Sequence, residues 1–389
     1  GSLSLASGST LAMQFGEANV VGGALNDLIE VGGDLVLDGT LDVTIPAGGT
    51  FGPGIYRVIN YGGALTDNGL DLGVMPAGGA STVQTSIAGQ VNLVNTDGLL
   101  LNFWDGNAGP KFNNAVDGGD GVWQNSTGND NWTDADGVVN AAYADEAIAI
   151  FAGTGGTVTI DNSLGEVRTA GMQFAADGYE ISGEPLTLVG PQSTIRVGDG
   201  STAGAAFIAT IAADLTGDTQ LVKTDAGTLV LAGDNSYTGG TAIEGGTLAV
   251  SADVNLGDTA GGLTFNRGTL QTTADIESDR AVSFAGNGTV LTDEGTTFTL
   301  NGLLSGAGGL TKDGAGTLVV AGNNTGYTAA TTVARGTLSV SGVLGGRVTV
   351  SEAGRLEGTG QVGAVTNSGV VAPGSGIGQS DTITVRLRL

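Results

Sequence analysis

The sequence predicts an all-β chain wound into a β-solenoid, in which short strands stack coil upon coil. A passage of roughly thirty residues, 221–251, returns about ninety residues later as 310–341. Within these passages and between them, the tripeptide Gly-Thr-Leu or Gly-Thr-Val recurs about every twenty residues. Such repeats are typical of stacked architectures, because each unit buries its apolar face only against its neighbours.

The composition favours strands over collagen, disorder or helix. Glycine supplies 72 of the 389 residues, but proline supplies only 7 and no Gly-X-Y period is present, which excludes collagen. Hydrophobic residues make up 40% of the chain, which is more than a disordered chain carries. They come in short runs of Val, Ile, Leu and Thr between glycines, so we expect strands with glycine at the turns.

The spacing of the tripeptide indicates the length of one coil. It begins at Gly227, Gly246, Gly268, Gly288, Gly316 and Gly336, in steps of 19, 22, 20, 28 and 20 residues. A period near twenty residues is that of one coil of a β-solenoid. The step of 28 predicts a larger loop in one coil.

The residues of each Gly-Thr-Leu passage fit a corner followed by a strand. Glycine allows a tight corner with positive φ, and threonine is a good first strand residue. Leu248 and Val250 alternate with Ala249, which predicts that the two larger side chains point inward. Asn235 and Asn324 suit left-handed corner positions, from which their side chains can bond neighbouring backbone.

The two long copies share a pattern that is similar to a known repeat. The first copy contains Lys223, Gly227, Thr228, Leu229, Asn235, Tyr237, Gly246, Thr247 and Leu248, and the second contains Lys312, Gly316, Thr317, Leu318, Asn324, Tyr327, Gly336, Thr337 and Leu338. This pattern resembles the passenger-associated transport repeat of bacterial autotransporters, which are exported by type V secretion. The second copy differs by one inserted residue near Gly326 and by Ala329–Ala330 in place of two glycines.

The resemblance implies a single elongated, right-handed parallel β-helix that crosses the outer membrane of a Gram-negative bacterium and is displayed or released. It also implies a C-terminal outer-membrane barrel in the complete protein. The ending DTITVRLRL is too short for such a barrel, so a passenger fragment is expected. It implies no particular activity, because passengers share this scaffold and differ in what they carry.

Three segments are expected along the chain. Residues 1–103 are predicted to form an N-terminal β-helical segment, and residues 147–389 a β-helix that contains both repeats. Between them, residues 104–146 are rich in Trp, Asn and Asp and are predicted to form an excursion packed on the helix.

Charge and missing residue types exclude several classes of function. The chain has 39 acidic and 13 basic residues, a formal net charge of −26, which disfavours nucleic acid as a partner. No histidine is present, which excludes Ser-His-Asp catalysis, and no cysteine is present, which excludes thiolate metal sites. We expect a monomer whose partner is a host-cell surface protein or glycan, with self-association as an alternative.

The excursion holds the candidate ligand sites. Asp117, Asp120, Asn129, Asp130, Asp134 and Asp136 crowd into twenty residues, and such oxygen donors suit Ca²⁺; no other cofactor is expected. The alternative is a polar loop in which these side chains cap turns. Trp104, Trp123 and Trp132 either contact a sugar or protein ligand or pack the excursion onto the helix.

The sequence therefore predicts a non-enzymatic, surface-exposed passenger of adhesin type, a stalk whose C-terminal repeats promote folding and secretion. No catalytic residue is predicted. One alternative is a β-helical enzyme that acts on polysaccharides, which would place two carboxylates about 5 to 9 Å apart in a groove. Another is a structural spacer for a binding head nearer the N-terminus.

Overall fold

The computed structural model describes residues 1–76, 81–85, 87–125, 129–374 and 384–385, and almost all of its regular structure is β-strand. The chain forms two compact units: unit 1 comprises residues 1–144 and 163–165, and unit 2 comprises residues 145–162 and 166–389. The predicted all-β solenoid is confirmed, because both units contain stacked parallel strands. In the described part of the chain, no helix has the length and apolar character needed to cross a membrane.

Unit 1 begins with wide parallel coils. Leu3 pairs with Leu35 and Leu35 with Leu65, so one coil takes about thirty residues rather than twenty. Two of its sheets consist of β1 (Leu3–Ser4), β4 (Leu35–Leu37) and β7 (Leu65–Asp67), and of β2 (Thr10–Gln14), β5 (Thr40–Thr44) and β8 (Asp71–Leu72).

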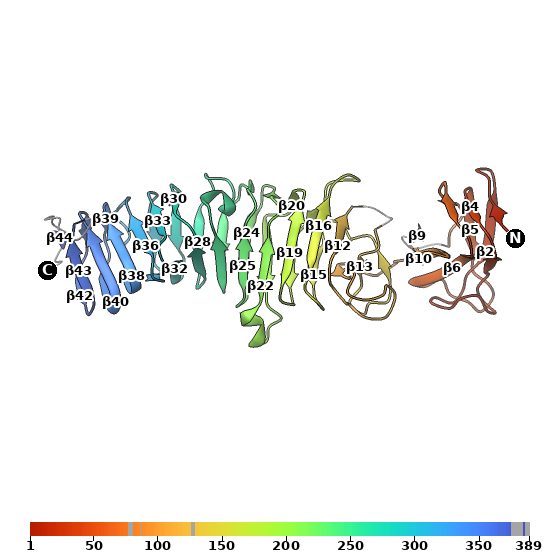
Figure 1. Ribbon diagram of the computed structural model, residues 1–389, viewed down its shortest axis with the longest axis horizontal. Helices are drawn as coiled ribbons and strands as arrows, with labels where there is room; N and C mark the ends of the chain where they lie inside the picture. The colour runs from red at the N-terminus through yellow and green to blue at the C-terminus, as the bar shows by residue number, and fades with distance from the viewer. Residues whose placement is uncertain (77–80, 86, 126–128, 375–383, 386–389) are drawn as a thin grey trace. The chain divides into compact units, whose positions relative to one another are not determined.

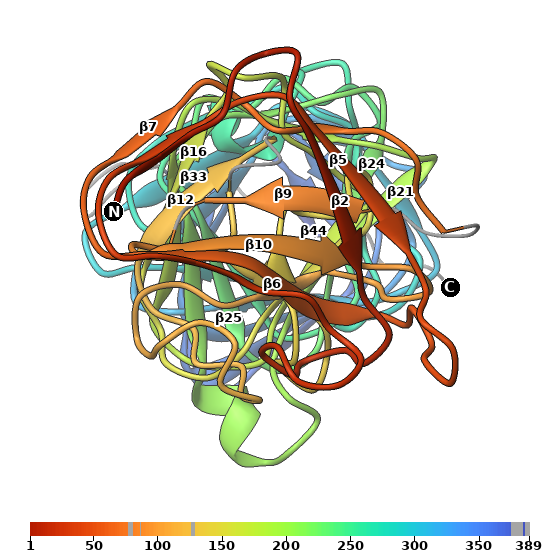
Figure 2. The same cartoon turned by 90° about the vertical axis from the view of Figure 1, so that its right-hand side faces the viewer.

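A third sheet of unit 1 departs from the parallel pattern. β3 (Ile29–Val31) pairs in parallel with β6 (Gly54–Tyr61), but β10 (Gln90–Asn95) then pairs antiparallel with β6 and with β9 (Ser81–Gln84). Figure 2 shows β6, β10 and β9 lying side by side. One face of this sheet buries Tyr56, Val58 and Leu93 in an apolar core. The opposite face carries polar side chains.

The Trp-containing segment belongs to unit 1 as well. Its described residues contain four short strands, β11 (Phe103–Trp104), β12 (Gly121–Gln124), β13 (Trp132–Thr133) and β14 (Asn140–Ala141). β13 pairs antiparallel with both β11 and β14.

Unit 2 is a parallel β-helix with three faces, and its strands stack in register along each face. Face A contains β15 (Ile148–Phe151), β18 (Gly171–Phe174), β21 (Gln192–Val197), β24 (Gln220–Thr224), β26 (Thr241–Ile243), β28 (Leu263–Phe265), β31 (Val282–Phe284) and β34 (Leu304–Gly306). Face B contains β16 (Thr157–Asp161), β19 (Tyr179–Gly183), β22 (Ile208–Ile211), β25 (Thr228–Leu231), β27 (Thr247–Val250), β29 (Thr269–Thr272), β32 (Gly288–Thr292) and β35 (Leu310–Asp313).

Face C and the last coils complete unit 2. Face C contains β17 (Arg168–Thr169), β20 (Leu186–Leu188) and β23 (Leu215–Thr216), and later β30 (Ile276–Ser278), β33 (Thr297–Leu300) and β36 (Thr317–Val320). The long strands β38 (Thr331–Val340) and β40 (Val348–Gly358) each continue faces B and C together, followed by β42 (Val365–Asn367) and β43 (Val370–Pro373). The shorter strands β37 (Asn323–Asn324), β39 (Val343–Leu344), β41 (Gln361–Val362) and β44 (Thr384–Val385) stack beside them.

Two short 3-10 helices interrupt the coils. η1 (Ala203–Ala206) lies in the loop between β21 and β22 and protrudes from the stack (Figure 1). η2 (Asp253–Leu256) follows β27, and the buried Arg280 fixes the loop after it by donating to the carbonyls of Gly257 and Gly261.

The inward side chains of unit 2 follow the predicted alternation. Leu248, Val250, Leu338 and Val340 are all buried, as the sequence predicts. Ala249, expected to face outward, is buried too, at 5% exposure. Phe265 stacks on Phe284 with ring centroids 5.0 Å apart.

The predicted loop in the 28-residue step is wrong. Thr289, in the Gly-Thr-Val passage, pairs with Thr311 rather than with Thr317. Thr317 instead pairs with Thr297, on face C. The longer step is therefore one ordinary coil plus the distance from face B to the next face.

The two long copies consequently lie on different faces. In the first copy, Lys223 is on face A and Thr228 on face B. In the second, Lys312 is on face B and Thr317 on face C. Residues that match in sequence are thus displaced by one face around the helix.

Candidate binding cleft and repeat corners

Each long repeat holds a buried lysine at a corner. Lys223 and Lys312 are both 0% exposed. The Lys223 Nζ donates to the carbonyl oxygens of Thr224 at 2.7 Å, Asp225 at 3.1 Å and Gly245 at 3.3 Å. The ammonium therefore links the corner of one coil to the corner of the next.

The second repeat makes the same set of contacts. The Lys312 Nζ donates to the carbonyl oxygens of Asp313 at 2.6 Å, Gly314 at 2.8 Å and Arg335 at 3.3 Å. Burial lowers the pKa of each lysine to about 8, although Asp225 beside Lys223 and Asp313 beside Lys312 oppose this shift. Sequence reasoning places both lysines in the repeat pattern but not inside the protein.

The glycine that follows each buried corner is required by the backbone. Gly246 has φ of 59° and Gly336 has φ of 67°, as the sequence predicts for a tight corner, but this prediction fails for the other tripeptide glycines, Gly227, Gly268, Gly288 and Gly316. A Cβ at Gly246 would lie 2.3 Å from the Gly227 oxygen, and one at Gly336 would lie 2.2 Å from the Gly314 oxygen. Both positions therefore exclude any side chain.

The repeat asparagines and tyrosines are structural groups. The side-chain oxygens of Asn235 and Asn324 accept from the N–H groups of Leu215 and Leu304 on the preceding coil, at 2.8 and 2.7 Å. This confirms the predicted bond to backbone, but neither asparagine has positive φ, so the left-handed assignment is wrong.

Tyr237 and Tyr327 are fully buried, but their hydroxyls have different partners. That of Tyr237 bonds the Thr241 hydroxyl at 2.7 Å, whereas that of Tyr327 donates to the Gly308 oxygen at 2.8 Å.

The three tryptophans form a buried aromatic cluster. Trp104, Trp123 and Trp132 are each 0% exposed, and Tyr143 joins them. The Trp132 ring lies 5.2 Å from that of Trp104, 4.8 Å from that of Trp123 and 4.5 Å from that of Tyr143. Because no face of these indoles is exposed, this arrangement supports the packing alternative and offers no surface for stacking a ligand.

Two acidic residues of the same segment accept hydrogen bonds from groups within it. Asp134 accepts from the N–H groups of Asp136 and Val139, and Asp117 accepts from Asn113. In the described residues, no group of three or more acidic side chains is placed to hold a metal ion. The Ca²⁺ candidates Asp117, Asp120, Asn129, Asp130, Asp134 and Asp136 stay a prediction.

Unit 1 contains a polar cleft that sequence reasoning did not identify. The polar face of the β6–β10–β9 sheet and the loops at 107–112 and 130–131 enclose about 640 Å³. The cleft is lined by Ile55, Arg57, Ile87, Ala88, Gln90, Asn92, Asn107, Pro110, Lys111, Phe112, Asp130 and Asn131.

A chain of hydrogen-bonded side chains forms the floor of this cleft. Paired positions on neighbouring strands bring these side chains together, as with Arg57 opposite Asn92 and Asn92 opposite Gln84. Arg57 donates through Nε to Asn92 at 2.6 Å and through Nη1 to Asn60 at 2.5 Å. The chain extends through Asn60 to Glu30 at 2.9 Å, and through Asn92 and Gln84 to Asp130.

The two cations of the cleft are partly desolvated. Burial lowers the pKa of Arg57, and the nearby Glu30 opposes this shift. Burial likewise lowers the pKa of Lys111, opposed by Asp105, Asp130 and Asp117. The Lys111 Nζ donates to the carbonyl oxygens of Asp105 and Gly106.

Phe112 lies in the cleft in an unusual backbone conformation. Its φ is 57°, a left-handed value that is rare for a bulky residue. Its N–H donates to the Asn140 side chain at 2.7 Å, which holds this conformation in place. Strained residues of this kind cluster at binding sites. Phe112 also lines an adjoining cavity of about 240 Å³, together with Arg57 and Ile55.

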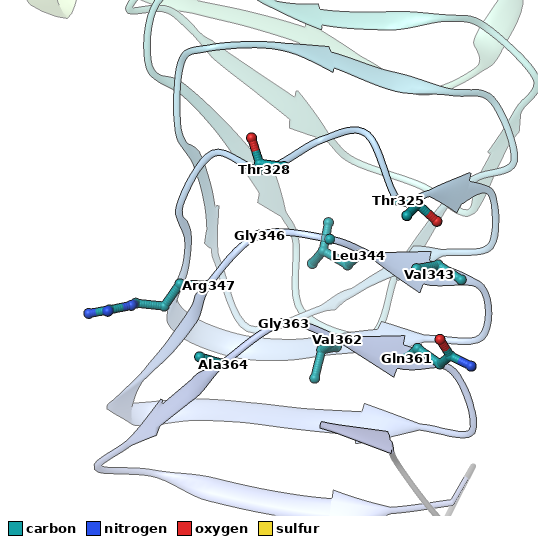
Figure 3. A pocket seen from close by; sticks show the side chains of 11 residues that line it. Thr325, Thr328, Val343, Leu344, Gly346, Arg347, Gln361, Val362, Gly363 and Ala364 are labelled. Atoms are coloured by element: carbon teal, nitrogen blue, oxygen red, sulfur yellow. The ribbon is translucent and has the colours of Figure 1, made fainter. Parts of the chain in front are cut away.

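Unit 2 has a separate hollow over its last coils. It has a volume of about 500 Å³ and is lined largely by glycine, backbone and small side chains between residues 325 and 364. Figure 3 shows Thr325 and Thr328 on one coil, Leu344 and Val362 on the next two, and Arg347 extending away. It gathers fewer charged and amide groups than the cleft of unit 1.

Comparison with known proteins places the repeats in a family. The passenger-associated transport repeat matches residues 221–250 and 310–340. The chain is also 62% identical over 306 residues, 79% of its length, to the adhesin BmaC autotransporter of Brucella suis biovar 1 (strain 1330). The two repeats are passenger-associated transport repeats, and the chain is similar to part of an autotransporter adhesin. A second relative, an extracellular serine protease of Serratia marcescens, is 51% identical over 77 residues, 19% of this chain.

The chain spans only a small part of these relatives. It covers 9% of the length of the Brucella adhesin and 7% of that of the Serratia protease. No solved structure matches the chain.

Proposed function

We propose that this chain is a non-enzymatic passenger segment of a surface-displayed adhesin of a Gram-negative bacterium, anchored through the outer membrane in the full-length protein. The observation that carries the proposal is the 62% identity, over 79% of the chain, to a protein named as an adhesin. In this function, the coils hold the cleft of unit 1 and the surface loops where a host protein or glycan can reach them.

The chemistry of the cleft supports binding over hydrolysis. Among the side chains that line it, only Asp130 carries a carboxyl group, whereas a glycosidase needs two flanking carboxylates. The match to a serine protease covers 77 residues, and this chain has no histidine to supply the base of a Ser-His-Asp triad. The structural spacer is the remaining alternative.

The repeats have a second role in the proposal, which is to promote folding and secretion. Every copy joins neighbouring coils through the buried lysine and asparagine contacts. In a solenoid, a stable coil can template the next, so folding outside the cell would favour outward movement of the chain.

Surface display tests the adhesin function. The chain is fused to an autotransporter translocator in a non-adherent bacterium, and bacteria attached to cultured epithelial cells are counted. We expect attachment well above that of bacteria displaying the translocator alone, and no release of reducing ends from polysaccharides. Attachment no higher than the control would favour the spacer, and release of reducing ends would favour the enzyme.

A further inference from the structure

We propose that the cleft of unit 1 binds the carboxylate of an acidic saccharide, such as a uronic acid residue within a short glycan. The inference rests on the proposed adhesin function and names its ligand class. Its starting point is the distribution of charge. Residues 1–144 contain fifteen acidic residues but only two basic ones, Arg57 and Lys111.

Both basic side chains line the same cavity although they are far apart in sequence. Arg57 comes from the centre of β6, and Lys111 from the loop after β11. Each has acidic neighbours, Glu30 near Arg57 and Asp105, Asp117 and Asp130 near Lys111, so an anionic ligand has to bind through the donors that these cations keep.

Each cation keeps a donor for a ligand. Arg57 donates through Nε and Nη1 to Asn92 and Asn60, and among the described residues no acceptor is bonded to its Nη2. The Lys111 ammonium has three protons, and two of them go to the carbonyl oxygens of Asp105 and Gly106. The asparagine bonds fix the guanidinium, so a carboxylate would meet a donor that is already oriented.

The remaining lining suits the hydroxyl groups and ring faces of a sugar. Gln90, Asn107 and Asn131 each offer a side-chain donor and an acceptor, which a hydroxyl group can match with both its proton and its oxygen. Phe112 supplies an apolar ring held in a fixed backbone conformation. The cleft volume of about 640 Å³ is in the range of small-ligand sites, and the adjoining cavity of about 240 Å³ shares Ile55, Arg57 and Phe112 with it.

The same charge balance argues against polyanions. Nucleic acid is bound through rows of Lys and Arg that neutralise many phosphates, and residues 1–144 have two such side chains against fifteen acids. A ligand with one carboxylate among neutral sugar units is attracted by the two cations, and it has few charges for the acidic side chains of the unit to repel. We therefore expect binding to weaken as the number of ligand charges rises beyond one or two.

The test uses the full chain and a matched pair of probes, a disaccharide that contains glucuronic acid and its neutral counterpart with glucose. Titration calorimetry is expected to detect the acidic disaccharide and to find the neutral one at least about tenfold weaker. Arg57→Gln and Lys111→Gln should each weaken the acidic probe by about tenfold or more. Arg196→Gln, which removes an exposed cation of unit 2, should leave its binding unchanged. Equal binding of the two probes, or unchanged binding in both cleft variants, would overturn the proposal.

A second measurement needs no variant in the cleft and so does not depend on whether Arg57→Gln folds. The sequence has three lysines, at positions 111, 223 and 312. With ¹³C-labelled lysine, the acidic disaccharide should shift the Lys111 signal and leave the two buried repeat lysines unmoved. A titration that moves none of the three signals would place any binding elsewhere.

The outcomes separate this inference from the adhesin function. Bacteria that attach to cells although the acidic probe does not bind would leave the adhesin function standing and remove the saccharide site. Binding of the probe without attachment would leave the site and remove the adhesin function.

Discussion

Loss of the proton from each buried lysine should make the folded protein more stable as pH rises. Lys223 gives the clearest test. Its pKa is lowered from 10.5 to about 8 because it is buried. Between these values the unfolded chain keeps the proton and the folded chain releases it, so the free energy of unfolding rises with pH. From pH 8 to pH 10 the shift corresponds to about 2 kcal/mol for Lys223. Lys312 acts in the same direction.

The upper limit of the window comes from the buried tyrosines. Burial raises the pKa of Tyr237 and Tyr327, so the folded state retains their protons where the unfolded state loses them. Their contribution to stability is therefore lost as pH rises beyond 10. A scan from pH 7 to pH 10 isolates the lysines.

Lys223→Met is the matching perturbation, since methionine keeps the apolar stem and removes the amine. At pH 7 the three carbonyl oxygens lose their donor, which should cost about 1 to 3 kcal/mol. The difference in unfolding free energy between wild type and variant should then grow by about 2 kcal/mol from pH 8 to pH 10. Arg196→Met, at an exposed ion pair, should show no such growth.

Two measurements check this reasoning. Guanidinium unfolding followed by circular dichroism at pH 7, 8, 9 and 10 gives the stability difference. Lysine ¹³C signals give the pKa values directly, because Lys223→Met and Lys312→Met assign two of the three signals. Parallel stability profiles for wild type and Lys223→Met, or titration of both repeat lysines near pH 10.5, would refute the account.

Three further predictions concern the aromatic cluster, the corner glycines and the relative stability of the two halves. Trp132→Ala should lower the free energy of unfolding by about 3 to 5 kcal/mol, since it removes the central ring of the cluster, and loss of cell attachment at an unchanged melting temperature would show a binding role instead. Gly336→Ala should lower the melting temperature clearly while Gly326→Ala, where nothing lies within 4 Å of the new Cβ, should not; equal melting of the two variants would contradict the corner geometry. In limited proteolysis at graded guanidinium concentrations, residues 221–389 should resist longest, and survival of residues 1–150 while 221–389 is digested would show that the repeats are not a folding seed.

The sequence was sufficient to predict the solenoid, because its evidence is local. Each Gly-Thr-Leu passage is enough to predict a corner followed by a strand. Strands do begin at Thr228, Thr247 and Thr269. The pairing partner of each strand could not be predicted in the same way. The spacing alone could not show that the 28-residue step advances by one coil and one face, because equal passages do not have to stack on each other.

The cleft of unit 1 could not be predicted from sequence patterns for a related reason. Arg57, Asn92 and Lys111 line one cleft only because β10 pairs antiparallel with β6 and the loop that contains Lys111 lies beside this sheet. No repeat in the sequence predicts this change to antiparallel pairing. The sequence offered one signal, the scarcity of basic residues. Two basic residues in an otherwise acidic stretch of 144 residues indicate a specific local role. The tryptophans are rare in this sequence, but they are buried because of their large apolar area.

The displacement of the two repeat copies shows what the repeat specifies. Lys223 reaches carbonyls of its own corner and of the next coil, and Asn235 reaches the preceding coil. Lys312 and Asn324 do the same one face further round. In each copy, one lysine bond and the asparagine bond join adjacent coils, and neither depends on which face the copy occupies. The repeat is therefore a set of contacts between neighbouring coils, which is how a one-dimensional stack gains stability, and it can secure the winding chain at any corner it reaches.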